Sequence, residues 1–187
     1  MAKRLYKSKW IDLYESDRGF IFAQRRSVNS TATLLYAKDG SDYKFLLRYQ
    51  PLPELKIKKM VNLKWTTLYP CCVTGSLETN ETPEQNVIKE VYEEANYLIK
   101  KKDIKAFNIA VSTTQMNEAV FNFIVDITNA KQIKKQQGDG SLFENISQNR
   151  WATHKVLKQI LLDSKNIYLS SLASAYLLFQ KQILNKV

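Results

Sequence analysis

The chain has 187 residues, 44% of them hydrophobic and 25% charged, and its formal net charge is +10 at pH 7. This composition is ordinary for a globular protein with one domain, and it excludes a mainly disordered chain. The positive charge favours anionic partners such as nucleotides, nucleic acid or acidic lipid, although a solvated lysine-rich surface would give the same balance.

The first 18 residues are mixed and polar, and they favour a short amphipathic segment or an arm. Three stretches rich in β-branched, aromatic or other apolar residues then predict strands. They are residues 19–26, 30–37 and 43–50. Lys38 to Asp42 (KDGSD) is a hairpin turn signal. Residues 51–63 predict a loop, and residues 65–75 predict one strand that ends at Gly75.

In the second half, residues 107–114 and 119–128 predict two more strands, joined through Gln115 to Glu118. Residues 129–149 are polar and predict a long loop. From Trp151 onward the pattern is helical, and it includes a last helix over about Leu169 to Leu184. This order of strands and helices predicts a single α/β domain over residues 1–187, with helices packed on a mixed sheet.

Two features bear on the compartment. Cys71 and Cys72 are adjacent, so they are poorly placed for a normal disulfide and lack the spacing of a zinc site. We expect both to be reduced and buried. No secretory signal opens the sequence, and no apolar run is long enough to span a bilayer. These features favour a cytoplasmic protein that does not enter a membrane.

The segment from Gly75 to Tyr97 (GSLETNETPEQNVIKEVYEEANY) carries the functional signal. Thr82 is a good helix N-cap, Pro83 suits the first helical position, and Gln85 completes a capping box. A helix that begins here places three apolar residues on one face. They are Val87, Val91 and Ala95.

The same helix brings Glu90, Glu93 and Glu94 side by side, at spacings of three and four residues. Clustered carboxylates repel one another unless a cation lies among them, and Mg²⁺ prefers oxygen ligands. Six of the 18 acidic residues lie in this segment, and Lys89 is its only basic residue. Taken alone, three such glutamates are more often a solvated acidic face. The rest of the pattern favours a metal site.

The segment resembles the Nudix box, G-x5-E-x7-R-E-U-x-E-E-x-G-U, where U is apolar. The gaps of five and seven residues are kept, and two positions depart from the pattern. Lys89 stands at the arginine position, where it keeps the charge but lacks the bidentate fork. Asn96 stands at the second glycine position, and asparagine tolerates the left-handed backbone that ends a helix. The matching residues are Gly75, Glu81, Glu90, Val91, Glu93, Glu94 and Tyr97.

The resemblance implies a Nudix-type α/β/α sandwich with a mixed sheet, in which residues 75–97 form a loop-helix-loop. It implies that Glu90, Glu93 and Glu94 bind Mg²⁺ or Mn²⁺ and take part in catalysis, helped by the main-chain carbonyl near Gly75. Glu81 would support these ligands without touching the metal, and Lys89 would hold the Glu90 carboxylate. The implied reaction is attack of a metal-activated water on a phosphorus atom of a diphosphate.

A further carboxylate outside the box often serves as ligand or base in this family. Glu144 is the first candidate, because it precedes Trp151 by seven residues and a tryptophan commonly opens the penultimate helix region in the family. Glu118 is the second. Arg26 and Arg48 are candidate phosphate contacts, because guanidinium groups suit phosphate oxygens. Tyr49 and Tyr69 are suited to stacking on a base or to packing in the core.

The substrate stays open between two branches of the family. The length and the strands ahead of the box resemble ADP-ribose pyrophosphatases, in which the N-terminal segment helps to form a homodimer with a shared substrate site. The residues VTGSLE at the start of the box are similar to dihydroneopterin triphosphate and deoxynucleotide pyrophosphatases. A third hypothesis is a 5′-pyrophosphohydrolase acting on RNA, whose binding would weaken steeply with salt. A fourth is a non-catalytic scaffold that binds nucleotide or RNA. No organic cofactor is implied.

Overall fold

The computed structural model describes residues 2–52, 66–134 and 145–185. Within these residues, seven strands form one mixed sheet of order β12-β5-β4-β10-β9, in which β6 pairs with β5 and β7 pairs with β4. Strands β4 and β10 run parallel, and the other neighbours are antiparallel. The strands are β4 (Ser30–Asp39), β5 (Asp42–Pro51), β6 (Leu68–Cys71), β7 (Val73–Ser76), β9 (Ile104–Val111), β10 (Ala119–Asp126) and β12 (Gln148–Thr153).

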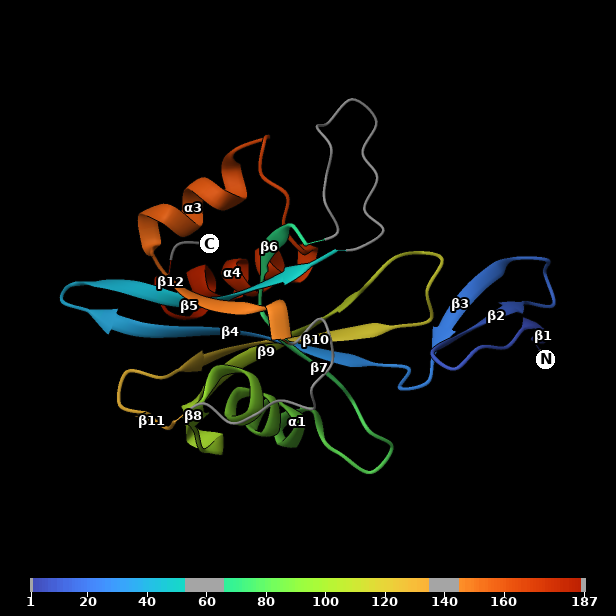
Figure 1. The fold of residues 1–187 in the computed structure, drawn as a ribbon, viewed down its shortest axis with the longest axis horizontal. Helices are drawn as coiled ribbons and strands as arrows, with labels where there is room; N and C mark the ends of the chain where they lie inside the picture. Colours follow the sequence, from blue (N-terminus) through green and yellow to red (C-terminus); the bar gives the residue numbers. More distant parts are fainter. Residues whose placement is uncertain (1, 53–65, 135–144, 186–187) are drawn as a thin grey trace.

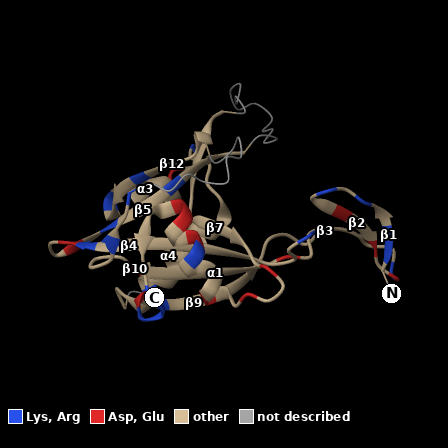
Figure 2. Cartoon of the chain, turned by 60° about the horizontal axis from the view of Figure 1, so that its bottom comes forward, with Lys and Arg blue, Asp and Glu red and all other residues tan. Residues whose placement is uncertain are grey.

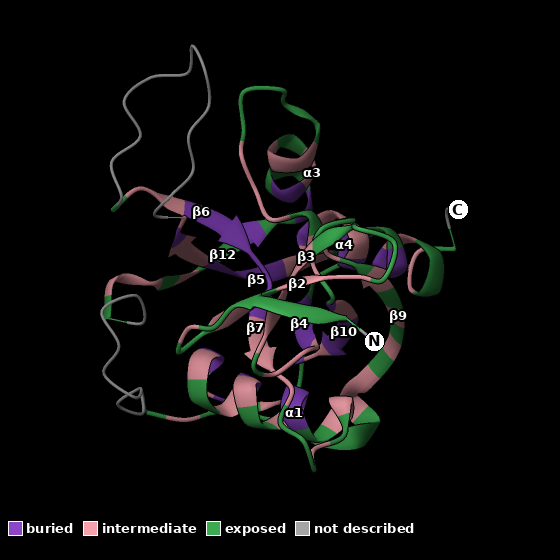
Figure 3. Ribbon diagram, turned by 90° about the vertical axis from the view of Figure 1, so that its right-hand side faces the viewer, coloured by how far each residue is buried: buried purple, intermediate pink, exposed green. Residues whose placement is uncertain are grey.

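Helices cover both faces of this sheet, as Figure 1 shows. Helix α1 (Pro83–Glu90) continues into one π-helical turn, η1 (Val91–Ala95), and packs on one face; α3 (His154–Leu162) and α4 (Ser170–Gln182) lie on the other. Each face has its own apolar cluster, and Figure 3 shows the buried residues concentrated in the central strands. The α/β/α sandwich with a mixed sheet is therefore confirmed.

The first 18 residues were expected to form a short amphipathic segment or an arm, and they contain two strands; the strand expected over residues 19–26 is present as a third. β1 (Lys3–Tyr6), β2 (Ile11–Glu15) and β3 (Ile21–Arg25) make a separate three-stranded sheet that projects from the main body (Figure 1). The main chain of Ala23 bonds to that of Gln115 and of Asn117, in the turn between β9 and β10, at 2.8 Å each. These bonds connect the small sheet to the large one.

The hairpin predicted at Lys38 to Asp42 is confirmed, since Asp39 pairs with Asp42 and Gly40 has a φ of 62°. The single strand predicted over residues 65–75 is wrong. Cys71 pairs with β5, whereas Val73 pairs with β4, so the chain changes partner at the buried Cys72 and forms two strands. An apolar run indicates burial, but it carries no information on which neighbour it pairs with.

Near the C-terminus, the expected helical start at Trp151 is also wrong. Trp151 of β12 pairs with Leu46 of β5, and α3 begins only after Thr153, whose hydroxyl caps it.

Part of the predicted loop over residues 129–149 lies outside the described residues, and part forms the short strand β11 (Lys131–Gln132), which pairs with β8 (Tyr97–Leu98). A 3-10 turn, η2 (Lys101–Asp103), precedes β9. In the described part of the chain, no helix has the length and apolar character needed to cross a membrane.

Candidate active site

The start of α1 is fixed by the capping box that the sequence predicts. The main-chain N–H of Gln85 donates to the Thr82 hydroxyl at 3.2 Å, and the main-chain N–H of Thr82 donates to Oε1 of Gln85 at 2.8 Å. Pro83 occupies the first turn. Because the helix begins at a defined residue, the direction of every later glutamate on it is also defined.

Asn86 is fully buried between the helix and the sheet. Its Nδ2 atom donates to the main-chain oxygen of Ser76 at 3.0 Å and to Oε2 of Glu81 at 2.8 Å, while its Oδ1 accepts from the Thr31 hydroxyl. Asn86 thus joins β4, β7 and the loop before α1. Through the bond to Glu81 it also holds that carboxylate against the protein. Sequence reasoning passed over Asn86, although a polar residue beside the apolar stripe of a helix is a signal for such a role.

Glu90 and Gly75 are in close contact. A Cβ atom on Gly75 would lie 2.5 Å from both Cδ and Oε1 of Glu90, so the Glu90 carboxylate occupies the space that a side chain at position 75 would need. The first glycine of the segment is therefore required by a glutamate on the helix that follows it. This contact brings the two predicted site residues together.

The Glu90 carboxyl is half-buried and surrounded by like charges. Burial raises its pKa to about 7, and the negative charges of Glu94, Glu93 and Glu81 contribute further, whereas the positive charge of Lys89 opposes them. A carboxyl with such a pKa exchanges its proton near neutrality, and it is stabilised in its ionised form by a nearby cation. The arrangement is typical of a functional site rather than of a solvated helix face.

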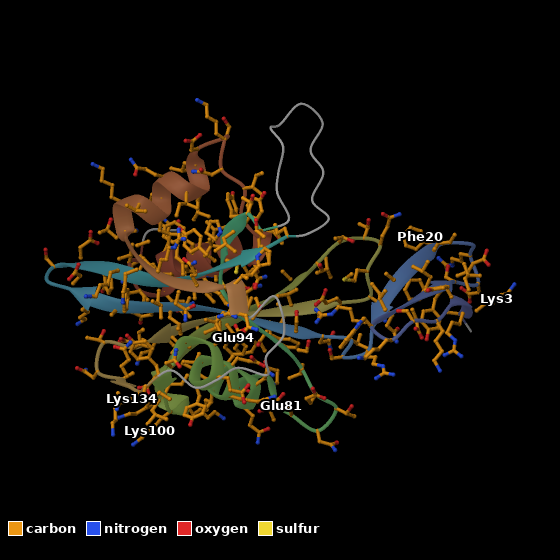
Figure 4. The ribbon with its side chains drawn as sticks, viewed as in Figure 1. Lys3, Phe20, Glu81, Glu94, Lys100 and Lys134 are labelled. Atoms are coloured by element: carbon orange, nitrogen blue, oxygen red, sulfur yellow. The ribbon has the colours of Figure 1, made fainter. Side chains whose placement is uncertain are left out.

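Glu94 lies in the π-helical turn and points toward the sheet (Figure 4). Its Oε1 is 3.0 Å from Nη2 of Arg48, and its Oε2 accepts from the main-chain N–H of Thr74 at 3.4 Å. The segment ends where Asn96 adopts a left-handed φ of 63°, as predicted from the glycine position of the pattern. Isolated π-helical turns are frequent at functional sites.

The other two charged residues of the predicted site, Glu93 and Lys89, are exposed. Figure 2 shows acidic positions gathered along this helical segment in an otherwise basic chain. Within the described residues, no three side chains of metal-binding type converge closely enough to enclose an ion. The donor chemistry nevertheless fits a hard divalent cation. Glu90 and Glu94 bring carboxylate oxygens to the same strand, at Gly75 and Thr74, and Glu90 lies in a cradle that only glycine leaves open.

A second polar cluster lies at the N-terminal ends of β4 and β10, where Ser30 pairs with Ser76 of β7. Glu118 is buried, and its Oε1 accepts from Nη1 of Arg25 and from the Ser30 hydroxyl, each at 2.8 Å. Nη2 of Arg25 donates to the Ser76 hydroxyl at 2.7 Å. Glu118 is therefore positioned by an ion pair and does not face solvent as an ordinary surface carboxylate would.

A cavity of about 560 Å³ is lined by Arg25 and Glu118 of this second cluster, whereas neither Glu90 nor Glu94 lines it. Its lining runs from Thr74, Gly75 and Ser76 to Arg25 and Glu118, and it includes serines at the N-terminal end of α4. Of the two neighbouring arginines in β3 and just after it, Arg25 lines this cavity, whereas Arg26 is exposed and does not line it. The sequence alone could not show which of the two arginines faces the cavity.

The remaining predicted residues have mixed positions. Glu144 lies outside the described residues. Tyr69 is buried, and Tyr49 packs at the edge of the core with the Arg150 guanidinium 4.6 Å above its ring. Cys71 and Cys72 are free and buried, as expected, and burial raises the pKa of both thiols.

His154 bonds to Tyr176 at 2.8 Å and to Asp42 at 3.1 Å, within the packing of α3 and α4.

Comparison with known proteins gives support at the level of the fold. The sequence matches no protein-family model, and no curated protein is similar to it in sequence. Among solved structures, the chain is similar to the crystal structure of an ADP compounds hydrolase, with a TM-score of 0.61 and 11% sequence identity. The similarity covers 100% of this chain and 95% of the other. At this identity the likeness shows that the two chains share a fold.

Proposed function

We propose that this protein is a metal-dependent pyrophosphohydrolase that cleaves the diphosphate bond of a nucleoside diphosphate derivative, such as ADP-ribose or a nucleotide sugar. The observation that carries the proposal is the placement of Glu90 against Gly75, with Glu94 beside it at Thr74. The resemblance of this segment to the Nudix box and the shared fold with an ADP compounds hydrolase support the same class of reaction.

The residues of the chain suggest a division of roles. Glu90, Glu94 and the main-chain carbonyl near Gly75 would hold Mg²⁺ or Mn²⁺, with Glu93 and Glu144 as further candidates. When bound, such an ion lowers the pKa of a water molecule and neutralises charge on phosphate oxygens. In the metal-free protein burial raises the pKa of Glu90 to about 7, and a bound cation would favour its ionised form, which is the form that binds metal. Asn86 and Glu81 keep the loop before the helix in place.

The cavity next to Gly75 is the proposed substrate site. A volume of about 560 Å³ falls within the range of small-molecule pockets, roughly 300–1,000 Å³. Arg25 offers a guanidinium group to a phosphate, and the serine and asparagine side chains of the lining offer hydrogen bonds to sugar hydroxyls. The cavity is linked to the two glutamates through its lining, because Gly75 contacts Glu90 and the main-chain N–H of Thr74 faces Glu94.

A substrate panel tests the proposal. Purified protein would be incubated with Mg²⁺ and ADP-ribose, nucleotide sugars, dinucleoside polyphosphates, dNTPs or 5′-triphosphate RNA, and released products would be separated by chromatography. Glu90→Gln and Glu94→Gln should abolish turnover, whereas Glu84→Gln, in the first turn of the same helix, should leave it unchanged. Turnover of dNTPs alone, or of RNA with a steep salt dependence, would favour a triphosphate or an RNA substrate instead. No turnover by the wild type, with retained nucleotide binding, would favour a scaffold.

We further propose that the protein forms a homodimer through the N-terminal sheet. This sheet projects from the body (Figure 1). It exposes Tyr6, Trp10 and Phe20, whose exposed fractions are 59%, 71% and 48%. The ADP-ribose pyrophosphatase branch, in which this segment contributes to a dimer, supports the proposal. Light scattering coupled to size exclusion should give a dimer mass, and Trp10→Ser combined with Phe20→Ser should give a monomer mass. A monomeric wild type would exclude the dimer.

A further inference from the structure

Arg48 is a buried cation beside the two glutamates, and its contacts differ from those of a phosphate ligand. Only 6% of the residue is exposed, and Nη2 lies 3.0 Å from Oε1 of Glu94, whose side chain is also largely buried. Arg48 does not line the cavity next to Gly75. A buried guanidinium paired with a buried carboxylate positions that carboxylate strongly, because breaking the pair leaves an uncompensated buried charge and raises the free energy of the folded protein.

Glu94 is held at both its side chain and its main chain by neighbouring residues of two strands. Arg48 on β5 and Asn149 on β12 are direct partners in the strand pairing. Arg48 bonds the Glu94 carboxylate, and Nδ2 of Asn149 donates to the Glu94 main-chain oxygen at 2.6 Å. The second carboxylate oxygen faces the main-chain N–H of Thr74, next to Gly75. The sheet, and not the helix alone, thus determines where the Glu94 carboxylate lies.

Lys89, the basic residue of the box, is not placed for this task. It is exposed, and within the described residues no acidic side chain lies at ion-pair distance from it. Its charge does lower the pKa of Glu90, but it makes no directed bond to a carboxylate there. The guanidinium that the box pattern places in the helix is absent from the helix, and one is present on β5 instead.

We propose that Arg48 is the positioning residue of the candidate metal centre, and that it holds the Glu94 carboxylate from β5, whereas the box pattern expects a basic residue of the helix to hold Glu90. The inference rests on the proposed function only in so far as Glu90 and Glu94 bind a divalent cation. Residues that orient a metal ligand through a hydrogen bond typically change metal affinity by about 10–100-fold when they are removed. Arg48 is assigned this role in place of the phosphate contact expected from the sequence.

Mn²⁺ binding, measured by electron paramagnetic resonance of the free ion, tests the inference without any need for turnover. Arg48→Gln should weaken Mn²⁺ affinity by about tenfold or more, whereas Lys89→Gln should stay within about twofold of the wild type. Arg48→Lys keeps the charge but loses the planar fork, so it should fall between the two. Glu94→Gln gives the loss expected when the ligand itself is removed. Circular dichroism would establish that each variant is folded.

Each failure has its own signature. If Arg48→Gln does not fold, the comparison of Arg48→Lys with Lys89→Arg decides, because only the former should lose affinity. Wild-type affinity in folded Arg48→Gln or Arg48→Lys, or an equal loss in Lys89→Gln, would overturn the inference and leave the metal centre intact. A wild-type protein that binds no Mn²⁺ would overturn the proposed function, and this inference with it.

Discussion

The carboxylate of Glu90 occupies the space in which Gly75 would carry a side chain. A strand residue and a helix residue thereby form one site, and the contact is possible only because one of them is glycine. Glycine is needed for two different reasons in this chain. Gly40 is needed for its backbone angle, a φ of 62°, and has open space around its Cα, whereas Gly75 is needed for the space beside it.

Substitution of Gly75 by alanine should therefore damage the site more than the fold. The new methyl group would collide with Cγ of Glu90 and lie 2.5 Å from Cδ and Oε1, so the Glu90 side chain should move away while the strand stays paired. We expect Gly75→Ala to reduce Mn²⁺ affinity or turnover by about tenfold or more. Gly40→Ala, the matched control, should cost about 1–2 kcal/mol of stability at its left-handed φ and leave turnover unchanged. Equal activity of Gly75→Ala and the wild type would contradict the role given to this glycine.

Removal of the Glu90 charge should stabilise the metal-free protein at high pH only. Burial is the first cause that raises its pKa from 4.5 to about 7. As pH rises, Glu90 therefore ionises at a lower pH in the unfolded chain than in the folded protein. The free energy of unfolding should fall as pH rises from 4.5 to about 7, and the loss is complete above about 7. With chelator present, Glu90→Gln should melt at a higher temperature than the wild type at about pH 8 and close to it at about pH 4.

The control for this measurement is Glu84→Gln, because Glu84 does not contribute to the raised pKa of Glu90. Its melting temperature should follow that of the wild type at every pH. A Glu90→Gln variant that is less stable than the wild type at high pH would mean that the ionised carboxylate makes a favourable contact in the folded protein, contrary to the sign derived from burial.

Asn86 should matter for both stability and the site. Its replacement by alanine leaves the main-chain oxygen of Ser76 and the hydroxyl of Thr31 without their buried partner. We expect Asn86→Ala to lower the free energy of unfolding by about 1–3 kcal/mol in a urea titration. Asn117→Ala removes an exposed amide whose side chain bonds Gln24, and it should change stability by less than about 0.5 kcal/mol. Equal stabilities for the two variants would refute the role given to Asn86.

Arg25 and Arg26 form a natural pair of test and control for the cavity. Arg25 lines it and pairs with Glu118, whereas the neighbouring Arg26 is exposed. With the substrate found in the panel, Arg25→Met should raise KM by about tenfold, the loss expected for a charged hydrogen bond of roughly 1.5–3 kcal/mol. Arg26→Met should leave KM unchanged. The opposite result would restore Arg26 as the phosphate contact expected from sequence. Melting curves would separate a binding effect from the loss of a partner for buried Glu118.

Local chemistry determined a large part of this protein from the sequence alone. The capping box at Thr82, the hairpin at Gly40 and the left-handed Asn96 each depend on contacts within a few residues, so short stretches of sequence are sufficient to predict them. The helical spacing of Glu90, Glu93 and Glu94 is local in the same way. Alternation and apolar runs indicated most strands correctly, because burial leaves its pattern in the residues themselves.

Only the tertiary structure decided which distant groups meet. Arg48 and Glu94 are 46 positions apart, and Arg25 and Glu118 are 93 apart. Their pairing depends on how the strands are arranged, and a pattern of apolar and polar residues does not specify that arrangement. The division of residues 65–75 into two strands and the extension of β12 through Trp151 have the same origin, because both follow from the choice of a neighbouring strand. Strand pairing is set by the packing of the whole chain, and local propensity does not specify it.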